Sequence, residues 1–584
     1  MKKRTILIIL IIIIFEAVIF GLYFYFKKVQ AQPVITKKLY FQTVPDNPES
    51  NLVSGAVPHH LAAKSLITEF FTAVAKQGAP QTIVLLGPDH FQAGILKQKQ
   101  ALVTLSPGTE KFFNLDVDKE LLAALDQEKN IIFDTSPISL DHGITNLLPF
   151  IQKYLPKTKI LPVIIPMEFT AADLKLVIKK ISQSNEQIMI IASTDFSHYL
   201  PPEAAKFHDV KSVRTLINFE EPELSQTEVD CWQCLEGARY YAKLKKEENY
   251  EIIGANNAAD FLPAVSAEQT TSYFSIIFGQ NLKTNDKAMG QTILFVGDIM
   301  LDRGVADLMK KNSVYYPFEK IQRFLSGTDL AVGNLEGPIV KKPENFGDHA
   351  MTFNFSDEIL PALAQNFNIL NLANNHILNR GNQGLAETRE FLEQSKINYF
   401  GDPVKCAEEF SYQKDNFIFL GINKTLTSTC PESEIVKTIK ALKAANPDKL
   451  IIVNIHWGSE YQKKNSSTQQ NLGHLMIESG ADLIIGHHPH VVQNIELYKN
   501  KLIFYSLGNF IFDQYFSKNV QQGLAVGLEF YPDKLICHLF PLQSSSSQPE
   551  LMPAKEASAF LEKLVDDSSE SLKAGIKEGI IEIK

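Results

Sequence analysis

Five short apolar segments in the second half of the chain, each followed at once by a polar side chain, most constrain the fold. The segments are 292–297, 329–333, 368–373, 450–455 and 482–486. Their length and composition are typical of buried strands, and helical periodicity lies between them. In the first half, residues 82–87 and 188–194 show the same strand pattern and residues 62–77 that of a helix. This alternation predicts α/β folds in both halves.

Each of the five segments leads into side chains that can bind a metal or transfer a proton. They are Asp298, Glu336, Asn375 with His376, His456, and His488 with His490. In open α/β sheets ligands bind beyond the carboxyl ends of strands, so we expect these side chains to converge. Mixed oxygen and imidazole ligands suit Mn, Fe, Zn and similar divalent ions. A carboxylate can also bridge two ions about 3.5–4 Å apart.

The segment His-His-Pro-His, residues 487–490, holds three of the 14 histidines. In an extended segment residues two apart point the same way, so His488 and His490 are predicted to face one site and His487 to face away. A single buried histidine is more often a core residue, and a single Asp298 more often a helix cap. The coincidence of five strand ends favours a metal site over both alternatives.

Six ordered motifs in this half resemble those of a known family. They are GDIMLDR, GNLEGPI, LANNH, IHWGSEY, GADLIIGHHPHVVQ and YSLGNFIFD. They resemble the CapA-like proteins of poly-gamma-glutamate capsule synthesis, a branch of the calcineurin-like metallophosphoesterases. The resemblance covers about residues 291–545 and implies a four-layer α/β/β/α sandwich. It implies as metal ligands Asp298, Glu336, Asn375, His456, His488 and His490. His376 would be the acid near the leaving group.

Two positions depart from the wider phosphoesterase pattern. Met300 stands where that pattern has a histidine two residues after Asp298, and Asn334 stands where it has an acidic bridging residue. The first metal position is therefore expected to be weaker or empty. Phosphoesterase activity follows by analogy only, because one fold can host many functions.

The first half also places histidines and carboxylates beside predicted strands and helices. The pairs are His59 with His60, Asp89 with His90, Asp141 with His142, and Asp195 with His198. The pattern resembles the Memo-like family, which is similar in fold to class III extradiol dioxygenases, over about residues 40–280. The resemblance implies an iron or copper site built from His59, His90 and His198. A cysteine that some members supply near the end of the domain is missing here. Scattered capping and core residues are the alternative, and Asp195 or His142 can equally be structural.

The N-terminal segment, residues 1–28, is an apolar run with basic residues at both ends and Glu16 within it. A run of about 22 apolar residues spans a hydrocarbon core of about 30 Å. We predict an uncleaved, single-pass membrane anchor with both domains outside the cytoplasm. The alternative is a signal peptide cleaved near residues 29–31, which have the small side chains of a cleavage site.

Charge and cysteine content exclude some classes of protein. The formal charge is −9, from 57 Lys+Arg and 66 Asp+Glu, and no basic stripe is present, so a nucleic-acid partner is not expected. Five cysteines are too few for a disulfide scaffold. Cys231 and Cys234 form one CxxC pair, whereas a zinc site needs a second pair. We favour two unpaired thiols, with a local disulfide as the alternative.

We therefore predict six segments. They are an anchor (1–28), a tether (29–45), a Memo-like domain (46–280), a linker (281–291), a CapA-like domain (292–545) and a helical tail (546–584). The leading functional hypothesis is a metal-dependent, phosphoesterase-like hydrolase acting on a cell-envelope or capsule polymer or its precursor. One alternative is a non-catalytic protein that binds the glutamate polymer during assembly or export. Another is redox chemistry at a metal in the Memo-like half.

Overall fold

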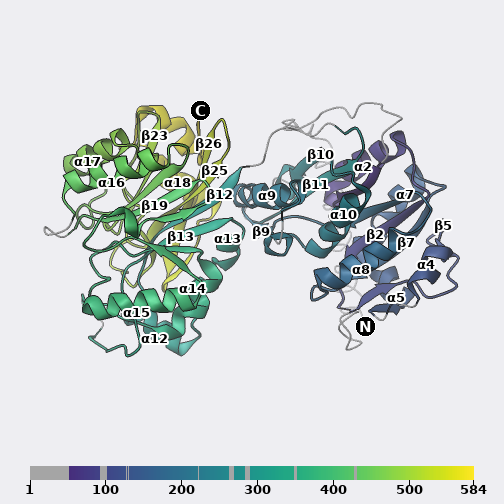
Figure 1. Ribbon diagram of the computed structural model, residues 1–584, viewed down its shortest axis with the longest axis horizontal. Helices are drawn as coiled ribbons and strands as arrows, with labels where there is room; N and C mark the ends of the chain where they lie inside the picture. Colours follow the sequence, from purple (N-terminus) through teal and green to yellow (C-terminus); the bar gives the residue numbers. More distant parts are fainter. Residues whose placement is uncertain are drawn as a thin grey trace, which may run out of the picture. The chain divides into compact units, whose positions relative to one another are not determined.

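The computed structural model describes residues 52–584, except 93–100, 127, 129, 221–222, 262–268, 283–289, 348–350 and 426–429. The predicted anchor and tether lie outside the described residues. Within the described part of the chain, no helix is long and apolar enough to span a bilayer. Both halves are mixed α/β structures, as predicted (Figure 1).

The first half is built on a nine-stranded sheet with a parallel centre. Its order is β10 (Tyr250–Asn257), β11 (Thr270–Gly279), β1 (Leu52–Val57), β8 (Ile188–Ser193), β2 (Thr82–Pro88), β7 (Lys159–Ile165), β3 (Leu102–Thr104) and β6 (Ile131–Phe133), with β9 (His198–Leu200) paired to β11. Helix α2 (Lys64–Lys76) packs against α7 (Leu148–Tyr154), and α10 (Trp232–Lys245) packs against α8 (Ala171–Ile181). The predicted apolar face of α2, including Phe70 and Phe71, is buried. The carboxyl ends of β1, β2 and β8 therefore share one edge of the sheet.

The second half contains two sheets. The nine-stranded sheet has the order β17 (Asn398–Phe400), β16 (Ile369–Asn371), β13 (Leu330–Leu335), β12 (Gln291–Ile299), β25 (Gln522–Phe530), β26 (Leu535–Ser545) and β27 (Gln548–Leu551), with β24 (Asn509–Ile511) on β12 and β28 (Ile580–Ile583) on β26. The six-stranded sheet has the order β18 (Tyr412–Lys414), β19 (Phe417–Asn423), β20 (Leu450–His456), β21 (Leu483–His487), β23 (Lys501–Phe504) and β22 (Ile495–Tyr498). In both sheets the strands that lead into the predicted site residues run parallel.

Alternating side chains pack these sheets into layers. Phe295 on β12 and Ile452 on β20 belong to one apolar core between the two sheets. The next residues along β20, Ile451 and Val453, point the other way into a core with α16 (Glu432–Ala445) and α17 (Ser467–Glu478). The outer face of the nine-stranded sheet packs against α12 (Arg303–Lys311), α13 (Gln322–Ser326), α14 (Leu360–Asn366) and α15 (Gly381–Gln394). The layers follow the order helix, sheet, sheet, helix (Figure 1).

The C-terminal segment departs from its prediction. It contains α18 (Ala554–Leu564) and α19 (Lys573–Glu578), but also β27 and β28, which both pair with β26. The amphipathic helix predicted for this tail is present as α18, with Leu561 and Leu564 buried, but the tail also contains two strands that were not predicted. The four-residue strand Ile580–Ile583 is too short to show a clear alternation in sequence, and its place is set by pairing with a longer strand.

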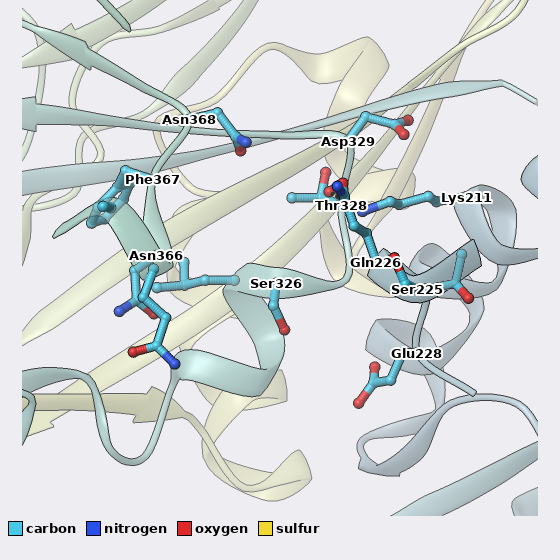
Figure 2. Close-up of a pocket in the computed structure, with 14 residues that line it drawn as sticks. Lys211, Ser225, Gln226, Glu228, Ser326, Thr328, Asp329, Asn366, Phe367 and Asn368 are labelled. Atoms are coloured by element: carbon cyan, nitrogen blue, oxygen red, sulfur yellow. Dashed lines mark hydrogen bonds between the residues drawn. The ribbon is translucent and has the colours of Figure 1, made fainter. Parts of the chain in front are cut away.

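Helix α9 (Pro202–Ile217) of the first half contacts the second half through buried polar groups. The Nζ of Lys211 donates to the carbonyl oxygen of Thr328 at 2.9 Å. Arg214 makes a bidentate ion pair with Asp329, with both N···O distances 2.7 Å. A polar cavity of about 430 Å³ lies beside these contacts and is lined by residues of both halves. Figure 2 shows Lys211 and Thr328 among its lining residues. None of the predicted site residues lines this cavity.

Four of the five cysteines are paired. The bonds are Cys231–Cys234 and Cys406–Cys430, and Cys537 is a buried thiol. The local-disulfide alternative for the CxxC pair is therefore the correct one. The second bond joins segments 24 residues apart, and no sequence motif indicated it.

Candidate metal centres

Asp298, near the end of β12, lies at the centre of the second-half site. Its carboxylate is fully buried and accepts hydrogen bonds from the Asn334 side chain at 2.8 Å and from the His488 backbone N–H at 3.3 Å. Burial raises the pKa of this carboxyl, but His487 and His490 outweigh burial and hold the pKa well below its usual range. Asp298 is therefore ionised, as a metal ligand must be.

Glu336 directly follows β13 and is also fully buried. Neither of its carboxylate oxygens has a hydrogen-bond partner among the described residues. The nearest groups are imidazole nitrogens, with Nε2 of His456 at 3.5 Å and Nε2 of His376 and His490 at 3.9 Å. Burial and the neighbouring Asp298 raise its pKa well above the usual value. An unpartnered buried carboxylate is costly unless a cation compensates it, so this residue fits a metal ligand.

Asn375 presents a second unpartnered oxygen. Its Oδ1 is buried and has no hydrogen-bond partner within the described ranges. The adjacent Asn374 differs, because its Nδ2 donates to the Leu335 carbonyl oxygen at 2.8 Å and its Oδ1 accepts from the N–H groups of His376 and Ile377. Asn374 therefore holds the turn, whereas the oxygen of Asn375 remains available to a cation.

Two imidazoles add unpartnered nitrogens at the same place. Nε2 of His456 and Nδ1 of His488 are buried without a hydrogen-bond partner in the described structure, and the two ring centres lie 4.8 Å apart. Burial lowers the pKa of His456 well below its usual value and that of His488 to about 4. Both rings are therefore neutral at pH 7, which is the form that binds metals.

Three sets of possible ligand atoms lie within 4.8 Å of one another in this half. They are Glu336–His456–His488, Asp298–Glu336–His490 and Glu460–His488–His490. The first and second contain residues from the ends of strands in both sheets, so these two sets form only when the sheets pack together. Five of the six predicted ligands belong to these sets, and the sixth, Asn375, directly precedes His376, whose Nε2 lies 3.9 Å from Glu336. The donor chemistry and the unpartnered atoms fit divalent ions of the Mn, Fe or Zn type.

Glu460 was not predicted from sequence. It lies four residues after His456 in the motif IHWGSEY, beyond the end of β20. The only feature of the sequence that pointed to Glu460 was its position four residues after a histidine at a strand end. That feature is weak, because a partly exposed glutamate in a loop is usually a solvated surface residue.

The histidine cluster is not an extended segment. Strand β21 ends at His487, and the chain then turns through φ values of 97° at His488 and 56° at His490. His487 does not face away, because its Nδ1 lies 3.3 Å from the Asp298 carboxylate. The prediction for His487 was therefore wrong, since the two-residue alternation holds only in extended backbone. His490 reaches the site through this turn, and its Nδ1 lies 2.9 Å from Oδ1 of Asn509.

His376 lies beside the ligand set with a fixed ring. Its Nδ1 donates to Oδ1 of Asn379 at 3.0 Å, and its ring stacks on Phe353 with centres 4.2 Å apart. Nε2 is then directed toward Glu336 at 3.9 Å. Burial lowers the pKa of His376, which favours the neutral ring in this structure.

The two departures from the phosphoesterase pattern have structural counterparts. Met300 is fully buried, and its sulfur accepts from the Asp302 N–H at 3.1 Å, so this position supplies no imidazole. Asn334 is buried and donates to Asp298 instead of adding a second carboxylate. The site therefore relies on Asp298 and Glu336 for its negative charge, with the partly exposed Glu460 beside them.

In the first half, His59, His90 and His142 offer nitrogens within 4.8 Å of one another. Asp141 fixes His90 by accepting from its Nδ1 at 2.8 Å, and the rings of His90 and His142 stack 3.8 Å apart. His198, the third predicted ligand, lies on β9 and belongs to neither ligand set found among the described residues of this half.

His59 also belongs to a second set, with Asp195 and Asp230. Its Nε2 lies 3.6 Å from Asp195 and 3.4 Å from Asp230. Burial lowers the pKa of His59 to about 4 and raises those of Asp195 to about 7 and Asp230 to about 6. Asp230 precedes the CxxC pair in a loop, and no sequence pattern linked it to the histidines. These donors fit one cation held by nitrogen and oxygen ligands.

Comparison with known proteins agrees with this division. Residues 292–514 match the family described as bacterial capsule synthesis protein PGA_cap, and residues 23–273 match the Memo-like protein family. The capsule biosynthesis protein CapA of Bacillus anthracis is 30% identical over 319 residues, which cover 50% of this chain and 77% of that protein.

Two further relatives cover one half each. The PGA biosynthesis protein CapA of Bacillus subtilis is 29% identical over 248 residues, 39% of this chain and 65% of that protein. A MEMO1 family protein of Pyrobaculum aerophilum is 24% identical over 175 residues, 29% of this chain and 61% of that protein. The chain thus spans less than two thirds of the length of each of these two relatives.

Proposed function

Since this chain belongs to the bacterial capsule synthesis (CapA-like) family and carries a Memo-like domain ahead of the family's own domain, we propose that it is a metal-dependent hydrolase acting on a phosphate ester of a capsule or cell-envelope polymer or its precursor. One observation carries this proposal. Glu336, His456 and His488 form one ligand set and carry buried, unpartnered donor atoms, and Asn375, the residue before His376, has a further buried, unpartnered oxygen.

The residues of this site would divide into metal ligands, a proton donor and a residue that orients the donor. Asp298, Glu336, Asn375, His456, His488 and His490 would hold divalent metal ions. Such ions supply an activated water and stabilise negative charge on a phosphoryl oxygen. His376 belongs to none of the ligand sets found among the described residues, and its Nε2, once protonated, would donate a proton to the leaving oxygen. Asn379 would keep that ring in place by accepting from Nδ1.

The substrate side of the proposal rests on the relatives. Their printed names connect two of them with capsule or PGA biosynthesis. A polymer or a precursor of it is therefore the class to test first. The alternative is that the same site holds a polyanionic glutamate polymer during assembly or export without cleaving it.

A second candidate activity belongs to the Memo-like half. The grouping of His59, His90 and His142, with Asp195 and Asp230 beside them, favours one iron or copper ion. Metal-dependent redox chemistry is the corresponding hypothesis. It is independent of the hydrolase, because no ligand is shared.

We also propose that the protein is anchored in the cell membrane by residues 1–28, with both domains outside the cytoplasm. The long apolar run with basic ends supports the anchor. The disulfide Cys406–Cys430 supports the location, because such bonds persist mainly in oxidising compartments. Carbonate washing of membranes should leave the full-length chain in the pellet, and a soluble chain beginning near residue 32 would contradict the anchor.

The hydrolase is tested with the full chain purified in detergent. Metal content is measured by elemental analysis, and turnover of p-nitrophenyl phosphate and bis-p-nitrophenyl phosphate is measured with added Mn, Fe or Zn. His456→Ala should lose metal and turnover together. His474→Ala is the matched control, because His474, on α17, pairs with Glu496 on β22 and belongs to none of the ligand sets. Metal binding without turnover of either ester would favour the polymer-binding alternative.

A further inference from the structure

Two exposed aromatic side chains stand next to the second-half metal centre. Tyr461 is 42% exposed and Phe516 is 67% exposed, and their rings meet edge to face with centres 5.2 Å apart. The ring of Tyr461 lies 6.3 Å from that of His490. Large aromatic rings left in water beside a polar site are typical of ligand-binding surfaces.

Tyr461 is held in place from two directions. Its backbone N–H donates to the Pro489 carbonyl oxygen at 2.8 Å, and its hydroxyl accepts from the Gln514 side chain at 3.2 Å. Gln514 in turn accepts from Asn509, whose Oδ1 lies 2.9 Å from Nδ1 of His490. A chain of hydrogen bonds therefore fixes the exposed phenol relative to a metal-ligating imidazole.

The backbone at Tyr461 is strained. Its φ of 63° lies in the left-handed region, which is costly for a bulky residue. Arg303, His488 and His490, which lie in or beside the same centre, also have positive φ values. Strained backbone conformations cluster at ligand-binding and catalytic sites, where the surrounding structure enforces them. The surrounding structure therefore holds Tyr461 in an unfavourable backbone conformation that places its ring beside the metal centre.

We propose that Tyr461 and Phe516 form a subsite for a sugar ring of the substrate, which places a phosphate ester at the metal centre. This inference rests on the proposed hydrolase and names its substrate class as a glycosyl phosphate. A sugar presents an apolar C–H face to an aromatic ring and hydroxyl groups to nearby amides, here Gln514. A glutamate chain has no ring, so it offers these two aromatic side chains no apolar face to stack on.

The experiment compares two phosphate esters on the metal-loaded full chain. N-acetylglucosamine 1-phosphate carries a sugar ring, and glycerol 3-phosphate carries none. Phe516→Ala should raise KM for the sugar phosphate about tenfold, the scale of one aromatic contact, and leave KM for glycerol 3-phosphate unchanged. Tyr461→Gly should do the same, since glycine tolerates the local φ. Tyr461→Phe should retain most of the preference.

Tyr315→Ala is the control, because Tyr315 is an exposed aromatic residue elsewhere in this half. Equal effects of Phe516→Ala on both esters, or no effect on either, would overturn the subsite. A larger effect on adenosine 5′-monophosphate than on the sugar phosphate would also overturn it, in favour of a nucleobase. If no ester is turned over, calorimetric binding of N-acetylglucosamine 1-phosphate decides. Binding that weakens in Phe516→Ala supports the subsite without the hydrolase, and absence of binding rejects both.

Discussion

Asn374 and Asn375 are neighbours in the chain, yet the side chain of Asn374 is hydrogen-bonded through both its oxygen and its nitrogen, whereas that of Asn375 has a buried oxygen without a hydrogen-bond partner among the described residues. The sequence Asn-Asn-His therefore divides structural and ligand roles between adjacent residues. An amide oxygen also adds a ligand without adding charge to a site that already holds two buried carboxylates, Asp298 and Glu336.

The two asparagines should respond differently to truncation. Asn375→Ala should lower the metal content and the activity while changing the free energy of unfolding of the metal-free protein by less than about 0.5 kcal/mol. Asn374→Ala should destabilise the fold by about 1–3 kcal/mol, because it leaves buried N–H groups unpaired. Elemental analysis and denaturant unfolding measure the two effects. Equal metal loss in both variants without destabilisation would contradict the division.

His376 should separate catalysis from metal binding. His376→Ala should keep the metal and lose about 10²–10⁴-fold in kcat, the scale of general acid catalysis. The loss should shrink with p-nitrophenyl phosphate, whose leaving group needs little protonation, compared with an alkyl phosphate. If His376→Ala removes the metal, then His376 is a ligand instead of the acid.

His487 should contribute to metal binding and activity, although the sequence alternation predicted that it faces away from the site. His487→Ala removes an imidazole that lies 3.3 Å from Asp298, one of the groups that keep the Asp298 pKa low. We expect weaker metal binding and lower activity. His538→Ala is a control, because His538 is buried on β26 and pairs with Glu529 instead. Unchanged metal affinity in His487→Ala would show that this contact does not support the site.

The first half should bind iron or copper through a different third histidine from the one predicted. In the full chain, His90→Ala and His142→Ala should each lower the iron or copper content, whereas His198→Ala should not. Elemental analysis of the second-half metal in the same samples serves as the internal control. Loss of metal in His198→Ala alone would restore the original ligand set.

The ion pair between the halves gives a prediction for pH. Burial raises the pKa of Asp329, but Arg214 outweighs it, and the net pKa in the folded state is lowered. A lowered carboxyl pKa stabilises the fold above the unfolded value of about 4, and this contribution is lost as the pH falls through the folded value. Asp329→Asn should therefore cost about 3 kcal/mol at pH 7 and less under acid.

Glu390→Gln is the control for this measurement. Glu390 pairs with Lys341, and both side chains are about half exposed. Exposed pairs contribute little, so the change should be below about 1 kcal/mol at either pH. Unfolding at pH 7 and well below pH 4, at about pH 2, measures both variants, because the contribution of Asp329 is lost only below its unfolded pKa of about 4. A loss in Asp329→Asn that does not depend on pH would show that its carboxylate charge is not the stabilising group.

The strands and their end residues could be predicted from the sequence because burial imposes a local pattern. Five apolar segments fell on β12, β13, β16, β20 and β21, with ends shifted by only a few residues. Which side chains meet beyond those ends depends on turns. The positive φ values at His488 and His490 form a turn that no pattern of apolar residues reveals in the sequence. The orientation of His487 could therefore not be predicted from the alternation of an extended strand.

The site residues that lie in loops were the hardest to predict from the sequence. Asp230 and Glu460 join ligand sets although neither directly follows a predicted strand, and the Cys406–Cys430 bond links two segments without a motif. Each of these depends on a long-range contact between surfaces that only the packed structure brings together.

The polar contacts of α9 bear on why both halves are made as one polypeptide. If the halves were made as separate proteins, Lys211 would lose its contact with Thr328, and Arg214 would keep Glu220 but lose Asp329. A single polypeptide brings these groups together, because each half is delivered with its partner at high effective concentration. The two candidate metal centres are therefore made in a one-to-one ratio, without separate control of their expression.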